Sequence, residues 1–342
     1  MRPHVLVARL DNNGDVLLAG PAIRAIAATA GSVTLLCGPR GVDAAGLLPG
    51  VDEVVVFCAP WIDPEPERVD PLRLRVLVED LQRRQIDQAV ILTSFHQSPL
   101  PLALVLRLAG VPLIAAISED YPGSLLDLRH RVSDDIHEVE RNLSLVATLG
   151  YRLPPGDEGG LRIKRAPVAD ADVPYVVVHP GASAPARTWP SPKHAALVRA
   201  LVARGRKVVV TGGMDERALT AEVAGGDPRV TDLGGRIGFG QLADLLAAAD
   251  AVVVGNTGPA HLAAAVGTAV VSLFAPVVPA VRWRPWRVPH VLLGDQQAAC
   301  ANTRARICCV PGHPCLGRVT VDEVIAAIDR LTRPRANQVM AS

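Results

Sequence analysis

An acidic side chain follows the first apolar run of the sequence. Residues 9–15 read RLDNNGD and precede a second apolar stretch, so Asp15 stands at a predicted strand-to-helix turn. A carboxylate there can take a proton from a hydroxyl group as a general base. It can equally cap the helix, because free backbone amides and the helix dipole favour Asp at a helix start. Spacing alone leaves both roles open for Asp15.

Two later segments have the residue types of an anion site. Segment 178–190 follows a predicted strand and contains Ser183 and Arg187, whose guanidinium can grip phosphate oxygens through paired N–H groups. The alternative here is a solvated arginine and a hydrophobic staple formed by Trp189. Segment 255–261 (GNTGPAH) also follows an apolar strand, and the free amides of the helix start would bind an anion. A His such as His261 in that helix is more often a packing residue than a catalyst.

The remaining polar motifs give weaker signals. Glu216, in segment 211–216 (TGGMDE), follows a predicted strand and can accept hydrogen bonds from ribose hydroxyls, with helix capping as the alternative. Asp170 and Asp172 have the D-x-D spacing of metal-dependent sugar transferases, but solvated loop acids are the better interpretation. A cysteine cluster near His313 lacks the paired C-x-x-C of a structural zinc site, so structural thiols are favoured over zinc. Its members are Cys300, Cys308, Cys309 and Cys315.

These motifs must be positioned by alternating strands and helices. Short apolar runs bounded by Gly, Pro or Asp alternate with helical-period segments, which is typical of βαβ units and a parallel sheet. Two helices are predicted in the first half, over 72–84 and 135–149, and the apolar stretch 99–117 is predicted to be a buried helix followed by a buried strand. Strands are predicted over 4–8, 33–37, 54–57, 88–92, 112–117, 175–178, 207–210, 230–232, 251–254 and 269–273.

The rhythm occurs twice and predicts an α/β chain of two doubly wound, Rossmann-like domains facing each other across a cleft. The expected boundaries are an N-terminal acceptor-side domain over 1–150, a Pro- and Gly-rich linker over 151–174, a C-terminal nucleotide-sugar-binding domain over 175–332 and a tail over 333–342. Strand ends would then bring the motifs to the cleft.

Composition excludes several classes of protein. Lys plus Arg number 35 and Asp plus Glu 34, so a net charge of +1 disfavours a nucleic-acid partner. The start of the chain lacks a signal-peptide core, and Arg107 and three prolines break the most membrane-like stretch, so we expect a cytoplasmic protein. Neither half has the G-x-G-x-x-G turn of a nicotinamide or flavin site, which disfavours a dehydrogenase.

The order of the motifs RLDNNGD, HPGAS with ARTWP, TGGMDE and GNTGPAHLAAAVGT resembles glycosyltransferase family 9, the heptosyltransferase family with the GT-B fold. Segments 92–98 (LTSFHQS) and 282–286 (RWRPW) extend the resemblance over nearly the whole chain. The resemblance implies transfer of a heptose from an ADP-linked donor to a hydroxyl group, with inversion at the anomeric carbon and without a metal or other cofactor.

The resemblance also implies roles for individual residues. Asp15 would be the catalytic base, and Arg187 falls where many members have a phosphate-binding Lys. Asn256 stands where many members carry Asp. The donor-binding set would be Ser183, Arg187, Gly212, Glu216, Asn256, Thr257, Gly258 and His261, with Glu216 at the ribose; the acceptor-side set would be Asn12, Asn13, Phe95, His96 and Gln97.

Other functions stay open on the same scaffold. A nucleotide-sugar isomerase or epimerase is one alternative, and a non-catalytic nucleotide-sugar binder is another, because a fold alone does not fix a reaction. For a transferase, the acceptor would be an envelope glycan, the lipopolysaccharide core or a small natural product. A lipid-linked acceptor would make the protein peripheral to a membrane.

Overall fold

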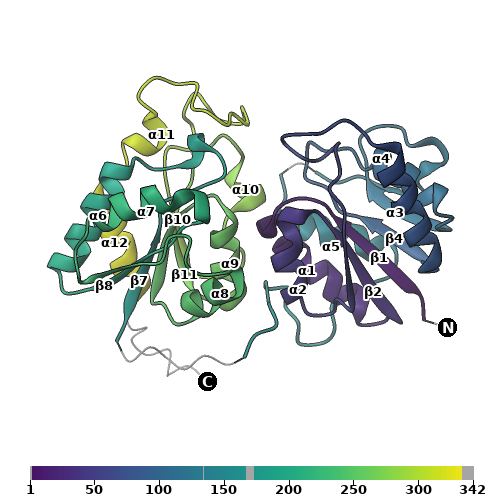
Figure 1. The fold of residues 1–342 in the computed structure, drawn as a ribbon, viewed down its shortest axis with the longest axis horizontal. Coiled ribbons are helices and arrows are strands. Elements are labelled where there is room, and N and C mark those ends of the chain that lie inside the picture. The colour runs from purple at the N-terminus through teal and green to yellow at the C-terminus, as the bar shows by residue number, and fades with distance from the viewer. Residues whose placement is uncertain (1, 134, 167–172, 333–342) are drawn as a thin grey trace. The chain divides into compact units, whose positions relative to one another are not determined.

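The computed structural model describes residues 2–133, 135–166 and 173–332. Contacts divide the chain into two compact units, Met1–Arg165 and Ala166–Ser342, and this boundary lies inside the predicted linker. Each unit is a sheet covered by helices (Figure 1). The predicted tail over 333–342 and the Asp170 and Asp172 pair lie outside the described residues.

The first unit is built on a six-stranded parallel sheet with the order β3-β2-β1-β4-β5-β6. Helices α1, α2 and α5 pack together, and α3 packs against α4. The elements are β1 (His4–Arg9), α1 (Asn13–Ala27), β2 (Ser32–Cys37), α2 (Val42–Leu47), β3 (Glu53–Val56), α3 (Pro71–Arg83), β4 (Gln88–Ile91), α4 (Leu100–Leu108), β5 (Leu113–Ile117), β6 (Leu128–His130) and α5 (Glu138–Thr148).

The second unit repeats this topology with the order β12-β11-β10-β7-β8-β9. Helix α6 packs against α7 and α12, and α8 packs against α9. The elements are β7 (Tyr175–His179), α6 (Ser191–Ala203), β8 (Lys207–Val210), α7 (Arg217–Ala224), β9 (Val230–Asp232), α8 (Phe239–Ala247), β10 (Ala251–Gly255), α9 (Gly258–Val266), β11 (Ala269–Leu273), α10 (Ala280–Trp283), β12 (His290–Leu293), α11 (Pro314–Gly317) and α12 (Val321–Thr332).

The register of the central strands determines which loops are neighbours. Strand β1 pairs with β2 and β4, so the loops after Arg9 and Ile91 leave the same edge of the first sheet side by side. Strand β7 pairs with β8 and β10, so the loops after His179, Val210 and Gly255 leave the same edge of the second sheet side by side. Each sheet therefore gathers its polar motifs at the carboxyl ends of its strands, as expected for doubly wound folds.

The two-domain α/β prediction is confirmed, with some local differences. Each sheet has one more strand than predicted, β6 and β12, both short edge strands. Helix α5 begins at Glu138 instead of 135, because the His137 side chain accepts a hydrogen bond from the Val139 amide and caps the helix. Among the described residues, no helix is long and apolar enough to cross a membrane; the stretch 99–117 forms α4 and β5.

Part of the predicted linker packs on the first unit. Arg24 of α1 donates from Nε to Asp157 Oδ2 at 2.7 Å and from Nη2 to the Gly160 carbonyl at 2.8 Å. The Tyr151 hydroxyl donates to the Gln88 side chain at 2.7 Å. Residues 151–165 therefore belong structurally to the first unit.

Candidate active site

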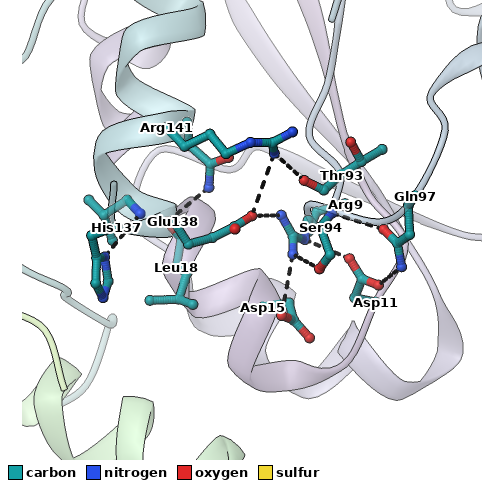
Figure 2. A network of polar contacts seen from close by, with 12 residues as sticks. Arg9, Asp11, Asp15, Leu18, Thr93, Ser94, Gln97, His137, Glu138 and Arg141 are labelled. Atoms are coloured by element: carbon teal, nitrogen blue, oxygen red, sulfur yellow. Dashed lines mark hydrogen bonds and ion pairs between the residues drawn. The ribbon is translucent and has the colours of Figure 1, made fainter. Parts of the chain in front are cut away.

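A buried arginine organises the carboxyl edge of the first sheet. Arg9 is the last residue of β1, and its side chain is fully buried. Its Nε lies 2.8 Å from Asp11 Oδ2, its Nη1 2.6 Å from Glu138 Oε1 and its Nη2 3.3 Å from Asp15 Oδ1. Figure 2 shows the three carboxylates turned toward this one guanidinium. Arg9 thus joins the β1 loop, α1 and the start of α5.

Hydrogen bonds from the β4 loop complete the cluster. Arg9 Nη2 donates to Ser94 Oγ at 2.8 Å. The Gln97 amide donates to Asp11 Oδ1, while its oxygen accepts from the Ser94 amide at 2.9 Å. Asp11 is therefore held between Arg9 and Gln97, as Figure 2 shows. These contacts fix the loop that carries the predicted acceptor-side residues.

Charge in the cluster favours the guanidinium cation. Burial alone lowers the pKa of Arg9, but the carboxylates of Asp11, Glu138 and Asp15 outweigh it, so the pKa lies above its ordinary value. Burial raises the pKa of Asp11, and the charge of Asp15 raises it further, against the opposing effect of Arg9. A permanent cation is thus shared by three acidic side chains.

Asp15 is the most accessible of the three carboxylates. Its side chain is 21% exposed, against 9% for Asp11 and 0% for Glu138. It lies in the first turn of α1, where the helix dipole favours a negative charge, and Asn12 occupies the N-cap position. Asp15 can therefore meet a substrate while Arg9 holds its carboxylate from the buried side.

The predicted acceptor-side residues do not all face one space. Asn13 is turned toward α2, where its Oδ1 accepts from the Ala44 amide at 3.0 Å. Phe95, His96 and Gln97 instead line a pocket of about 160 Å³ with Arg141, whose guanidinium carbon lies 4.6 Å from the centre of the Phe95 ring. Aromatic, charged and amide groups in one pocket suit a hydroxyl-rich ligand.

In the second unit, Arg187 ends a short 3-10 turn, Pro185–Arg187, in the loop after β7. The loop after β10 approaches this turn closely: a Cβ atom at Gly255 would lie 2.8 Å from the Arg187 carbonyl oxygen. Helix α9 begins three residues after Gly255, with Thr257 as N-cap and no side-chain capping hydrogen bond. The structure thereby brings Arg187 to the start of α9.

His261 lies in the first turns of α9 and is buried. Burial, together with a smaller effect of the Arg187 charge, lowers its pKa to about 4, so the imidazole is neutral at physiological pH. Its Nδ1 atom is buried without a hydrogen-bond partner among the described residues. Asn256 is also buried beside this turn. Guanidinium, helix amides and a neutral imidazole form an electropositive corner that suits an anion.

Glu216 lies between the loops that follow β7 and β8. Its Oε2 accepts from the Gly213 amide at 2.7 Å and lies 3.7 Å from His179 Nε2. The carboxylate also covers Gly181, where a Cβ atom would fall 1.8 Å from Glu216 Oε1. Glu216 therefore caps its own turn, which was the alternative role predicted for it. This capping holds the carboxylate at the carboxyl edge of the sheet.

The predicted donor-binding residues Gly212 and Ser183 make fewer polar contacts than Glu216 among the described residues. Gly212 packs against α7, where a Cβ atom would lie 2.7 Å from Thr220 Cγ2, and Ser183 is exposed in the β7 loop. Trp189 has the packing role that was the alternative for its segment: its indole is buried and donates to the Val319 carbonyl at 3.2 Å. Within the described ranges, no group of three or more His, Cys, Asp or Glu side chains could hold a metal.

Sequence reasoning missed Arg9, its partners Glu138 and Ser94, and Arg141, which lies 4.0 Å from the same Glu138 carboxylate. One signal was available, because an arginine ending the apolar run HVLVAR must be paired if it is buried. The identity of the partner was not available, since Glu138 lies 129 positions further along the chain. Only the folded chain joins the two.

Comparisons with known proteins agree with this architecture. The sequence profile of glycosyltransferase family 9 (heptosyltransferase) matches residues 74–312. Lipopolysaccharide heptosyltransferase 3 of Escherichia coli is 30% identical over 271 residues, which cover 67% of this chain and 78% of that protein. Lipopolysaccharide heptosyltransferase 1 of Pseudomonas aeruginosa is 30% identical over 272 residues, covering 70% and 75%.

The fold agrees as well. The solved structure of E. coli ADP-heptose lps heptosyltransferase II has a TM-score of 0.76 at 19% identity, covering 96% of this chain and 98% of that one. The chain therefore belongs to glycosyltransferase family 9, the heptosyltransferase family, and is a glycosyltransferase with the GT-B fold.

Proposed function

We propose that this glycosyltransferase moves a heptose from an ADP-linked donor to a hydroxyl group on a lipopolysaccharide core or another envelope glycan. The proposal takes its donor and acceptor from the relatives, which are named for lipopolysaccharide and ADP-heptose. We further propose that the anomeric carbon is inverted and that no metal is required. One observation carries the proposal: Asp15 is the most accessible member of a carboxylate cluster held by a buried arginine.

Asp15 acts as the general base in this proposal. A sugar hydroxyl becomes a competent nucleophile only as its proton leaves, and the Asp15 carboxylate accepts that proton during attack on the anomeric carbon. Attack from the face opposite the leaving group inverts the configuration. Arg9 holds the carboxylate in one orientation through the Nη2 contact at 3.3 Å.

The second unit binds the donor in this proposal. Arg187 and the amides of Thr257 and Gly258 hold the diphosphate and offset the negative charge that grows as the sugar bond breaks. This fixed positive charge does the work that a divalent cation does in metal-dependent transferases. Glu216 accepts hydrogen bonds from the ribose hydroxyls, and His261 orients the loop that contacts the diphosphate.

Two substitutions test the assignment. Asp15→Asn is expected to lower turnover of ADP-heptose at least about a hundredfold, because the base is lost, while ADP affinity measured by calorimetry stays within about twofold. Arg187→Ala is expected to weaken ADP binding. Glu79→Gln, at an exposed carboxylate of α3, is the matched control and should leave both quantities unchanged. Unchanged turnover in Asp15→Asn would rule out this base.

Product analysis separates transfer from the alternatives. A transferase releases ADP only when an acceptor is present, whereas an isomerase or epimerase converts the donor without releasing nucleotide. The proton NMR coupling at the new anomeric position reports inversion. Full turnover in the presence of EDTA is the expected result for a metal-independent reaction.

A further inference from the structure

A late segment of the chain holds the turn that carries Arg187. The backbone amide of Ala186, the residue before Arg187, donates to the Arg306 carbonyl at 2.9 Å. The Ala186 carbonyl accepts from His313 Nε2 at 3.1 Å. A carbonyl can only accept, so His313 carries a proton on Nε2. Both backbone polar groups of Ala186 are therefore held by residues more than a hundred positions away.

The holding segment, residues 300–319, is fixed to the core of the second unit. Cys300, Cys315 and Leu316 are buried in that core. The Val319 carbonyl accepts from the Trp189 indole at 3.2 Å and from Lys193 Nζ at 2.7 Å. Segment 300–319 thus contacts the Arg187 loop on both sides of Arg187, at Ala186 and at Trp189. A contact at both sides restricts the turn more than either alone.

The backbone of the holding segment is strained. Asn302, Arg304 and His313 have φ values of 62°, 56° and 48°, in the left-handed region that non-glycine residues seldom adopt. Such conformations persist where the surroundings determine them fully, and they cluster at functional sites. At His313, the amide donates to the Val310 carbonyl at 3.1 Å and the carbonyl accepts from the Gly317 amide at 2.8 Å. These two hydrogen bonds fix the backbone from which the imidazole extends.

We propose that His313 is a positioning residue for Arg187. It holds the Ala186 carbonyl, while the close approach of Gly255 to the Arg187 carbonyl limits movement of the next residue. The guanidinium is then kept where the donor's diphosphate must bind. This inference rests on the proposed function, in which Arg187 contacts that diphosphate.

Loss of the hydrogen bond should weaken donor binding. His313→Ala and His313→Phe both remove the donor group, and Phe also keeps the volume of the ring. We expect the Kd for ADP and the KM for ADP-heptose to rise about three- to tenfold, the effect of one hydrogen bond, with kcat lowered less. His313→Gln keeps an N–H donor and should restore most of the affinity. His313 is partly exposed, so folding should survive in at least one variant.

His290→Ala is the matched control. Its ring also bonds a backbone carbonyl, with Nδ1 2.9 Å from the Val288 oxygen, but it lies on the edge strand β12. ADP affinity should stay within about twofold of that of the unmodified chain. A melting curve for each variant reports general loss of structure, which would affect control and test variants alike.

A double substitution decides whether His313 acts through Arg187. In an Arg187→Ala background, His313→Ala should change ADP affinity no further. An equal loss in both backgrounds, or full ADP affinity in both His313→Ala and His313→Phe, would overturn the inference and leave the proposed function intact. Unchanged ADP affinity in Arg187→Ala alone would instead overturn the proposed donor site.

Discussion

Replacing Arg9 by Met should remove the support of the carboxylate cluster. The side chain is fully buried and makes four contacts, to Asp11, Asp15, Glu138 and Ser94, between 2.6 and 3.3 Å. Met fills similar volume without the charge. Removing one partner of a buried ion pair costs about 3 to 5 kcal/mol, because the remaining charges stay buried and uncompensated. We expect a loss of that size in the free energy of unfolding at pH 7.

The loss should depend on pH. In the unmodified chain, burial raises the pKa of Asp11 above its unfolded-state value of about 4. The contribution of this group to the free energy of unfolding is therefore fully present below about pH 4. It is lost as the pH rises through the folded-state pKa, because the buried carboxyl group then has to ionise. Arg9 opposes that rise, and its removal raises the folded-state pKa further. The stability gap between Arg9→Met and the unmodified chain should therefore be smallest near pH 4 and should widen toward neutrality.

Urea unfolding followed by circular dichroism measures this gap at several pH values. Arg24→Met is the matched control, because Arg24 pairs with Asp157 in the same unit, with side-chain exposures of 9% and 5%. Both variants should be destabilised, but only Arg9→Met should also lower the turnover of its folded fraction, by at least about tenfold, since Asp15 loses its orientation. A gap below about 1 kcal/mol at pH 7 would refute the reasoning.

Two further predictions concern the second unit. Gly181→Ala should weaken ADP-heptose binding with little loss of stability, because the new Cβ would fall 1.8 Å from Glu216 Oε1 and displace that flexible side chain. Gly240 faces open space, so Gly240→Ala is the control. Calorimetry measures the affinity of both variants for ADP-heptose. His194→Phe should flatten the decline of stability in acid. Burial lowers the pKa of His194 to about 3, so its contribution is present above about pH 6.5 and is lost as the pH falls toward 3. A plot of melting temperature against pH with an unchanged slope in His194→Phe would contradict this.

The fold was predictable because its central strands are continuous apolar runs. Strands buried on both faces need such runs, and residues 251–254 and 4–8 stand out for that reason. The edge strands β6 and β12 were not predicted, because Leu128–His130 and His290–Leu293 are short, only partly buried and contain polar residues. The last residue of β1 also escaped, and that residue is Arg9.

The candidate site was predictable only in its local parts. Asp15, Arg187 and the start of α9 each follow a strand, so sequence order placed them at the ends of sheets. Contacts between distant segments were not readable: Glu138 reaches Arg9 across 129 positions, and His313 reaches Ala186 across 127. Such partners depend on tertiary packing, which one sequence does not encode in any local pattern.

The ion pair between Arg24 and Asp157 has a practical consequence for the design of an N-terminal fragment. A fragment cut at residue 150, where composition suggests a boundary, would strip away the chain that covers the end of α1 and would leave the Arg24 guanidinium without its carboxylate. It would also lose the Tyr151 hydroxyl that reaches Gln88. An N-terminal half intended to fold by itself should therefore extend through Arg165.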